Sequence, residues 1–401
     1  MSRTTGMTSS MERVGSEYTR EARGESMTAI EPVSLAGDPR TRDFLQFPEA
    51  LYRQSPHWVC PLRIERRDFF DPKKNPFFAN ADVQLFLAKR DGRTVGRISA
   101  HVYHPHNVTH NEKTGFFGFF ECENDYEIAG VLWDAARDWL KSRGMERMRG
   151  PANFTTNHEI GFLVEGFDSP PVVMMTYTMP YYLAFAERYG LTKAMDVYAY
   201  HGYSATGFDP RAERLIDRIK SRASATVRTI DMSHFAAEVA TVKKIYNAAW
   251  SPNWGFVPMD DAEIDHMAKD LKQIIDPRIV LFVEVDGRPV GFSLALPDIN
   301  QALIRLRGQL FPFGLIKLLW LLKVKKVCTR ARIMVMGILP EYQKRGIDTI
   351  LNFETYRRAR EAGYAEGEMS WVLETNEQMI AVAENLGYTR YKTYRMYEVP
   401  L

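Results

Sequence analysis

Apolar residues in the C-terminal part of the chain come in short runs that turn residues separate. Residues 279–285 and 290–296 are two such runs, and Asp286-Gly287 joins them, which is the pattern of a β-hairpin. A third apolar run, residues 332–339, ends at Pro340. The pattern predicts three consecutive strands in this region.

The segment after Pro340 changes from strand to helix periodicity. An apolar stripe begins at Ile347 and continues through Ile350 and Leu351, and Gly363 is typical of a helix C-terminus. Residues 369–373 then predict a strand, residues 379–386 a short helix, and residues 391–399 a last, alternating strand. Strands and helices in this order predict a mixed α/β layer.

The N-terminal half repeats this organisation. The segment 55–58 recurs as 251–254, residues 85–96 recur as 281–291, and residues 189–193 recur as 386–390, in the same order and at nearly the same spacing. The apolar face of the first copy's central helix is formed by Ile128, Val131, Leu132, Ala135, Ala136, Trp139 and Leu140. A co-linear series indicates duplication, whereas chance recurrence of hairpin and cap signals is the alternative.

The repeat suggests how the chain divides. At 401 residues the chain exceeds what one hydrophobic core usually supports, so two domains are expected. We predict a disordered tail at residues 1–30, an N-terminal copy at 31–204 and a C-terminal copy at 205–401. The C-terminal copy carries an insertion between Ala295 and Arg330, and the N-terminal copy one between His158 and Tyr189.

Composition restricts the classes of partner. The formal net charge is +2, so charge gives no reason to expect nucleic acid. Cys60, Cys122 and Cys328 lie far apart, without the spacing of a metal site or a disulfide framework, so we expect no metal and a reducing cytoplasm. Residues 1–30 lack the apolar stretch of a secretory signal, and no apolar run is long enough to span a membrane.

The C-terminal insertion contains an unusually apolar segment. Residues 310–322 are almost entirely apolar, and Lys323, Lys325 and Lys326 follow. Three interpretations stay open: an interfacial segment with a basic flank, a wall against a long acyl chain, or a buried core helix. The first predicts contact between residues 308–327 and a membrane surface, with the protein in the cytoplasm and peripheral on the inner membrane face.

The segment between the third strand and its helix carries the clearest chemical signal. A glycine-containing turn into a helix start presents unpaired backbone N–H groups to an anion, and the helix dipole adds positive potential. In this segment Gln343 is followed after two residues by Gly346 and then, after one more, by Asp348. This spacing resembles the pyrophosphate loop of the GNAT acyltransferase superfamily, which has Gln or Arg, then Gly, then Gly or Ala at these three positions. The acidic Asp348 departs from that pattern, and either crowds the cofactor or points away from it.

This resemblance covers about the last 120 residues, given the strands and helices around the loop. It implies two tandem GNAT-like domains, each a mixed, mostly antiparallel sheet flanked by helices, with acyl-CoA as co-substrate. The pyrophosphate is then expected on residues 343–348, and a backbone N–H near Gly337 or Ile338 is expected to polarise the thioester carbonyl. The predicted cofactor contacts are Gly337, Ile338, Leu339, Gln343, Lys344, Arg345, Gly346, Ile347, Asp348 and Asn376. The position of Asn376 favours a structural role, as the cap of the helix that follows.

The N-terminal copy lacks this loop. Its aligned segment, residues 123–127, contains three carboxylates beside Asn124 and Tyr126, and no glycine. We therefore expect this segment to reject phosphates, which leaves one cofactor site per chain.

An attacking amine needs a group that takes its proton. Glu368 and Glu374 stand six residues apart at the ends of a predicted strand, so alternation places them on one face. His158, beside Glu159, is a third candidate, for an amine bound between the copies. The alternatives to a catalytic role are that the two glutamates are solvated charges at the edge of the strand, and that His158 belongs to an ordinary polar loop.

Tandem layout and the Trp254-Gly255-Phe256-Val257-Pro258 segment resemble the GNAT-type proteins that include bacterial ceramide synthases. That resemblance implies transfer of a long acyl chain from acyl-CoA to the amine of an amphipathic acceptor such as a sphingoid base. The alternatives are acetyl-CoA-dependent acetylation of a small amine, an aminoacyl transferase of the Fem type, and a non-catalytic binding module.

Overall fold

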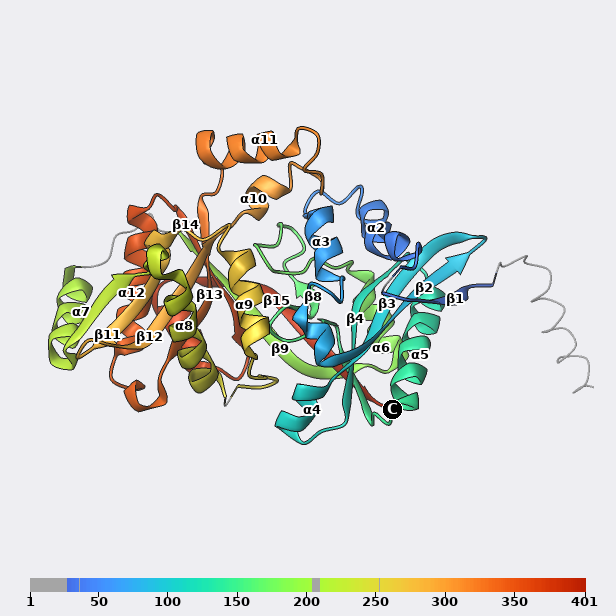
Figure 1. The fold of residues 1–401 in the computed structure, drawn as a ribbon, viewed down its shortest axis with the longest axis horizontal. Coiled ribbons are helices and arrows are strands. Elements are labelled where there is room, and N and C mark those ends of the chain that lie inside the picture. The colour runs from blue at the N-terminus through green and yellow to red at the C-terminus, as the bar shows by residue number, and fades with distance from the viewer. Residues whose placement is uncertain (1–26, 36, 204–209, 252) are drawn as a thin grey trace, which may run out of the picture.

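The strands form one large twisted sheet, and helices lie on both of its faces (Figure 1). The computed structural model describes residues 27–35, 37–203, 210–251 and 253–401. Most of the predicted tail, and Pro252 of the repeat, lie outside these residues. Strand β1 (Ala29–Val33) begins within the range predicted as tail.

The first copy contributes strands β2 to β9. These are β2 (Ala81–Arg90), β3 (Arg93–Tyr103), β4 (Thr114–Cys122), β5 (Arg147–Gly150), β6 (Ala152–Asn153), β7 (Glu159–Ile160), β8 (Phe162–Glu165) and β9 (Thr192–Tyr203). Its helices are α2 (Thr41–Leu51), α3 (Arg63–Phe69), α4 (His104–His110), α5 (Tyr126–Ser142) and α6 (Tyr181–Tyr189).

The second copy repeats this order. Its strands are β10 (Ala225–Thr229), β11 (Val280–Val285), β12 (Arg288–Pro297), β13 (Arg330–Ile338), β14 (Glu366–Leu373) and β15 (Thr389–Pro400). Its helices are α7 (Pro210–Ala223), α8 (Phe235–Trp250), α9 (Asp261–Leu271), α10 (Asn300–Leu303), α11 (Gly314–Leu319), α12 (Ile347–Glu361) and α13 (Glu377–Asn385). Each strand and helix predicted for this copy is present.

The two Asp-Gly turns form because their residues tolerate left-handed backbone conformations. Asp91 and Gly92 have φ of 52° and 71°, and Asp286 and Gly287 have φ of 51° and 73°. Positive φ at both central residues is what a tight hairpin turn requires. These turns fix the register of β2 against β3 and of β11 against β12.

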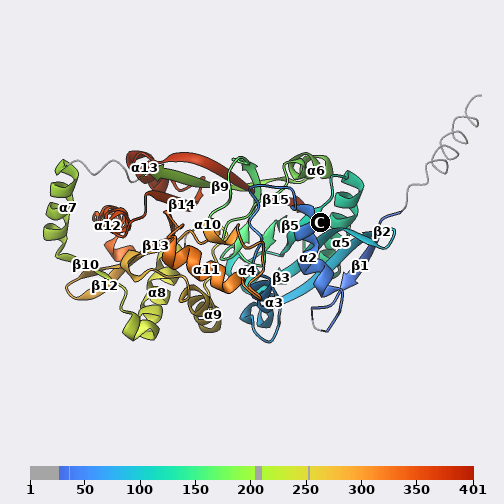
Figure 2. The ribbon, with the colours of Figure 1, turned by 90° about the horizontal axis from the view of Figure 1, so that it is seen from above.

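The last strand of each copy lies in the other copy's half of the sheet. The order is β1-β2-β3-β4-β5-β15-β9-β14-β13-β12-β11-β10, so β9 pairs with β14 and β15 pairs with β5. Figure 2 shows β9 and β15 side by side between the halves. With β8, which also pairs with β15, this exchange joins both copies into one 13-stranded sheet.

In each half, hydrophobic side chains are buried on both faces of the sheet. Helices α5 and α6 cover one face of the first half, and α12 covers the matching face of the second. Helix α2 packs on the opposite face of the first half and α8 on that of the second. Among the described residues, no helix is long and apolar enough to cross a membrane.

Candidate active site

The parallel strands β13 and β14 separate part-way along their length. Their pairing joins Arg330–Ile333 to Glu366–Met369 and ends there, although β13 continues to Ile338. The second half of β13 is therefore bonded to β12 on one edge, and no strand of the described residues pairs with its other edge. This opening exposes backbone groups at the level of the predicted thioester site.

The ladder with β12 determines which backbone groups face the opening. The N–H of Leu339 donates to the carbonyl of Val290 at 2.9 Å. Because antiparallel bonding alternates along a strand, the groups of Gly337 also face β12, and those of Met336 and Ile338 face the open edge. Trp250 Nε1 donates to Met336 O at 3.1 Å, and Gln343 Nε2 to Ile338 O at 3.2 Å, as this alternation requires. Of the two predicted amides, Ile338 has the suitable direction.

The loop before α12 has the form that an anion site requires. Gly346 is the residue before the helix, with φ of 78°, and Lys344 has φ of 60°. Among the described residues no side chain caps the first turn, so its N–H groups have no side-chain acceptor there. Lys344 and Arg345 are exposed, and no ion pair joins either to a carboxylate within the described part of the chain. Ile347 is buried in the core and anchors the helix.

Asp348 does not point its carboxylate at the loop. Its Oδ2 accepts a hydrogen bond from Gln378 Nε2 of α13 at 2.7 Å. A carboxylate in the first turn is also favoured by the helix dipole. Asn376 accepts from Met379 N at 3.1 Å and caps α13, the structural role that its position allowed.

The corresponding opening of the N-terminal copy is closed by the chain itself. The pairing of β4 with β5 also ends early, at Phe116 and Arg149. Beyond it, the N–H of Phe119 donates to Asn153 Oδ1 at 2.7 Å, and a Cβ on Gly118 would lie 2.0 Å from Ala152 O. The edge that is open in β13 is thus filled in β4.

The helix start of this copy is filled as well. Asp125 accepts from Glu127 N at 2.9 Å and caps α5, and Arg90 pairs with Asp125 at 2.7 Å. The chain's own carboxylate therefore occupies the position that a phosphate needs.

Two cavities meet beside the open edge of β13. The smaller, about 180 Å³, is mainly apolar and includes Trp250, Val335 and Trp371, and so spans the gap between β13 and β14. The larger, about 1010 Å³, runs between α2, α3 and α9 over the first copy. Both are lined by Asn157, Ile160, Met174, Met259, Met267 and Leu271. These residues therefore form a wall common to the cleft and the smaller cavity.

The cleft combines apolar walls with buried charges. Arg66 donates to Glu159 Oε1 at 2.6 Å, and Asn153 Nδ2 donates to Glu159 Oε2 at 2.9 Å. Burial raises the pKa of Glu121 to about 7, although the hydroxyls of Tyr52 and Tyr182 donate to it at 2.7 and 2.8 Å. This arrangement suits an amphipathic ligand with a cationic or hydroxylated end.

The three predicted bases lie in different surroundings. His158 lines the large cleft, and burial lowers its pKa to about 4, so the imidazole is neutral at pH 7. Glu368 is fully buried, and burial raises its pKa to about 7. Glu374 accepts from Lys193 Nζ at 2.5 Å and from Asp196 N at 3.1 Å. Neither glutamate lines either cavity.

The expectation that the two glutamates share a face fails because β14 contains a bulge. The register with β9 shifts between Met369 and Val372, and both of these residues pack in the same cluster although they are three apart. An inserted residue reverses the alternation beyond it. Glu368 and Glu374 consequently have no partner in common among the hydrogen bonds and ion pairs of the described residues.

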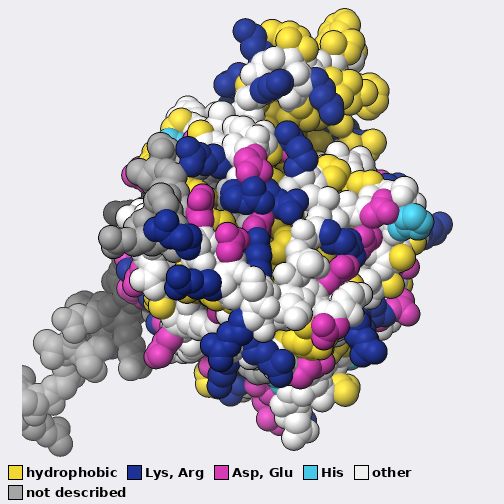
Figure 3. All heavy atoms as spheres, turned by 90° about the vertical axis from the view of Figure 1, so that its left-hand side faces the viewer, with side chains coloured by type: hydrophobic (Ala, Val, Ile, Leu, Met, Phe, Trp, Pro, Cys, Tyr) yellow, Lys and Arg dark blue, Asp and Glu magenta, His cyan; other side chains and the backbone are white. Residues whose placement is uncertain are grey.

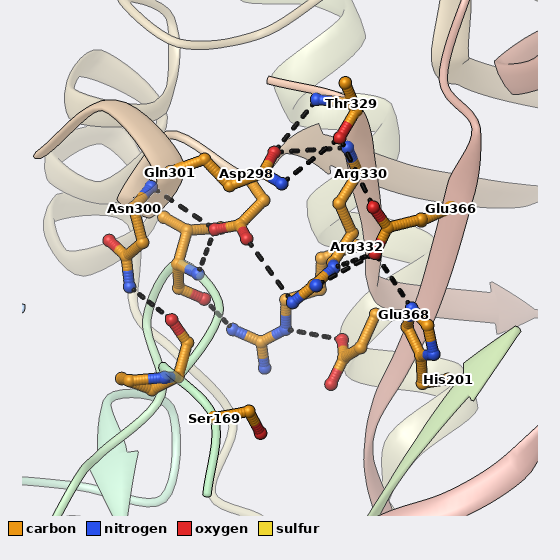
Figure 4. Close-up of polar contacts among 12 residues, drawn as sticks. Ser169, His201, Asp298, Asn300, Gln301, Thr329, Arg330, Arg332, Glu366 and Glu368 are labelled. Atoms are coloured by element: carbon orange, nitrogen blue, oxygen red, sulfur yellow. Dashed lines mark hydrogen bonds and ion pairs between the residues drawn. The ribbon is translucent and has the colours of Figure 1, made fainter. Parts of the chain in front are cut away.

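Glu368 belongs to a buried network that joins the two halves (Figure 4). Arg332 Nε lies 3.8 Å from Glu368 Oε2, and Arg332 Nη1 donates to the carbonyl of Val173. Asp298 accepts from Val173 N at 3.0 Å. Since Val173 and Met174 line the cleft, this network fixes one wall of the cleft to the second copy.

Comparisons with known proteins agree with this geometry. A bacterial ceramide synthase of Caulobacter vibrioides (strain NA1000 / CB15N) is 43% identical over 363 residues, covering 89% of this chain and 94% of that protein. The chain belongs to the bacterial ceramide synthase family. It is an acyltransferase, as the predicted resemblance implied. Protein YghO of Escherichia coli (strain K12) is 37% identical over 360 residues, covering 88% of this chain and 91% of that protein.

Solved structures confirm the tandem GNAT fold of this family member. A tandem GNAT protein from the clavulanic acid biosynthesis pathway superposes with a TM-score of 0.55 at 14% identity, covering 93% of this chain and 98% of that one. A glucosamine N-acetyltransferase region of a fungal β-N-acetylglucosaminidase gives a TM-score of 0.55 at 12% identity, covering 94% of this chain and 38% of that one. No protein-family model matches the chain.

Several residues of the two cavities were not found from the sequence. Arg66 and Tyr246 carry no motif, and their contacts with Glu159 and Asn157 join distant segments. Glu121 did carry a signal, because it is the one charged residue in an apolar strand, β4. A lone carboxylate in such a strand is often functional.

Proposed function

We propose that this acyltransferase uses acyl-CoA to acylate the amine of an amphipathic acceptor, with one catalytic site, in the C-terminal copy. The observation that carries the proposal is the contrast between the copies. The open edge of β13 lies beside a basic, uncapped helix start, whereas Asn153 and Asp125 fill both equivalent positions in the first copy.

In this proposal the pyrophosphate binds the N–H groups at the start of α12, with Lys344 and Arg345 adding charge. The pantetheine arm follows the free edge of β13, and the N–H of Ile338 donates to the thioester oxygen as it becomes negative. The apolar cavity between β13 and β14 receives the start of the acyl chain.

The acceptor occupies the large cleft with its amine at the wall that both cavities share. The lone pair of the neutral amine attacks the thioester carbon, the C–S bond breaks, and the thiolate leaves as CoA. Of the three predicted bases, His158 is the one that lines this cleft, and we assign it the proton that the amine loses. A sphingoid base fits the cleft's apolar walls and buried polar end, and the name of the Caulobacter relative agrees with such an acceptor.

Acetylation of a small amine is the second candidate. The observation in its favour is the limited volume of the cavity at the thioester, about 180 Å³. A non-catalytic module is disfavoured because Asp348 points to Gln378 and leaves the loop free.

Native mass spectrometry with acetyl-CoA and palmitoyl-CoA separates these candidates. We expect one palmitoyl-CoA per chain, bound more tightly than acetyl-CoA. Preference for acetyl-CoA would indicate small-amine acetylation. Binding of two molecules per chain would contradict a single site, and binding of neither would contradict the acyl-CoA mechanism.

A further inference from the structure

The insertion between β12 and β13 stands out from the body of the molecule (Figure 1). We call residues 308–327 the α11 projection. Its base is fixed: Arg63 N donates to Gly308 O at 3.2 Å, and Leu310 and Leu318 pack on the cluster formed by Val59, Leu303 and Leu306. Lys317 Nζ donates to Arg305 O at 2.6 Å, which ties the projection to its own stem. These contacts hold the base of the projection against the rest of the protein.

The outer surface of the projection is strongly apolar. Phe311, Phe313 and Ile316 are 72%, 74% and 66% exposed. Seven of the twelve exposed large hydrophobic side chains among the described residues belong to it: Phe311, Phe313, Leu315, Ile316, Leu319, Trp320 and Val324. The interpretation of this segment as a buried core helix is wrong for these residues. A concentrated apolar patch on a small projection is typical of an interaction surface.

The charge around this patch has one sign. The sequence contains no acidic residue from 299 to 340. The exposed basic residues are Arg305, Arg307, Lys317, Lys323, Lys325 and Lys326. Figure 3 shows apolar side chains next to lysine and arginine on the part of the molecule that projects at the top. Apolar insertion beside a basic flank is the combination that binds an anionic lipid surface.

The base of the projection also forms part of the wall of the acceptor cleft. Ile299 and Leu303, which precede the projection, and Leu310, at its base, line the cleft together with Pro61 and Leu62. The apolar base of the projection is therefore continuous with the apolar wall of the cleft.

We propose that the α11 projection docks the enzyme on an anionic membrane surface and admits the lipid acceptor to the cleft. Phe311, Phe313 and Ile316 enter the interface, and the lysines contact acidic headgroups. The delivery step rests on the proposed function, whereas docking itself does not. A second copy of this chain is a less suitable occupant, because two such basic surfaces repel each other.

Flotation with lipid vesicles tests the docking of the full chain. Vesicles of phosphatidylcholine alone are compared with vesicles that also contain phosphatidylglycerol. We expect binding to the anionic vesicles that weakens with salt. A Phe311→Ser/Phe313→Ser/Ile316→Ser variant should bind at least about tenfold more weakly. Lys323→Glu/Lys325→Glu/Lys326→Glu should weaken binding by on the order of a hundredfold. Val108→Ser, at an 82% exposed position on α4, is the matched control and should bind like wild type.

Two further measurements keep docking and catalysis distinguishable. Thermal unfolding should be unchanged in the variants, because the replaced side chains are exposed. Acyl transfer to a short-chain, water-soluble acceptor should be unchanged as well, whereas transfer to a vesicle-bound acceptor should fall with vesicle binding. Full activity without vesicle binding would overturn the docking proposal and leave the proposed function. Vesicle binding without any acyl transfer would overturn the proposed function and leave the docking proposal. Self-association that the serine variant abolishes, without vesicle binding, would also overturn docking.

Discussion

Replacement of Gly346 by glutamate places a carboxylate where the cofactor's pyrophosphate is proposed to bind. Part of the effect is conformational, because Gly346 has φ of 78°, and a side chain in that region costs about 1–2 kcal/mol. A Cβ there would also lie 2.9 Å from Ile219 Cγ2, so the side chain of Ile219 must shift. Gly346→Ala carries both of these effects without a charge.

The difference between the glutamate and alanine variants isolates the electrostatic effect. Two unit charges about 5 Å apart in an effective dielectric of about 20 repel by about 3 kcal/mol. That energy corresponds to a loss of affinity of about two orders of magnitude. In the free protein, by contrast, a carboxylate at a helix start is favoured by the dipole, so the glutamate variant should be at least as stable as the alanine variant.

Titration calorimetry with palmitoyl-CoA measures both variants. We expect Gly346→Ala to weaken binding by up to about tenfold, and Gly346→Glu by about a further hundredfold, with the second effect reduced at high salt. Gly92→Glu is the control, because Gly92 has φ of 71° and no atom within 4 Å of its added Cβ, in a turn of the other copy. If the glutamate and alanine variants of Gly346 bind palmitoyl-CoA equally, this loop does not hold the phosphates.

Three further predictions concern other parts of the site. Asn153→Ala leaves the buried N–H of Phe119 without its acceptor and should lower the free energy of unfolding by about 1–3 kcal/mol in urea titrations; a second molecule of bound acyl-CoA in this variant would show that Asn153 alone closes the first copy. His158→Gln should lower kcat by about a hundredfold or more while leaving the affinity for acyl-CoA unchanged. Because the pKa of His158 is lowered to about 4, its titration should not appear in the wild-type rate between about pH 6 and about pH 8; an unchanged kcat would exclude it as the base. Burial raises the pKa of Glu368 from its ordinary value of 4.5 to about 7, so the folded state holds this proton more tightly than the unfolded state does. Its contribution to stability is complete below about pH 4.5 and is lost as the pH rises through about 7, by at most about 3 kcal/mol. Glu368→Gln should flatten this part of the curve of unfolding free energy against pH, and an identical slope would contradict the assignment.

Most of the strands, helices and turns of the second copy could be predicted from local signals in the sequence. The Asp286-Gly287 turn, the start of α12 at Ile347 and the cap at Asn376 depend on residues close in sequence, so each could be predicted from a short segment. The direction of the Asp348 carboxylate could not be predicted from the sequence, because its hydrogen-bond partner, Gln378, lies in another helix.

The exchange of the last strands could not be predicted in this way. The alternating pattern of residues 391–399 predicts a strand, but it does not say which strand lies beside it. In the structure β15 pairs with β5 of the first copy, and β9 pairs with β14 of the second. The choice of neighbour is made by packing between residues far apart in the chain.

The bulge in β14 explains why one inference about the site failed. Period-two alternation holds only for a regular strand, and the register shift between Met369 and Val372 interrupts it. The residues that make the cleft polar were missed for a similar reason. Tyr52 meets Glu121, and Arg66 meets Glu159, only after the fold has formed.

The most direct test of the account is to incubate the purified chain with palmitoyl-CoA and a sphingoid base, and to measure free CoA and the amide product by mass spectrometry. The account predicts one N-acyl product for each CoA released, at a higher rate than acetyl transfer from acetyl-CoA to a small amine. Release of CoA without an amide, or no reaction with the long-chain pair, would contradict it.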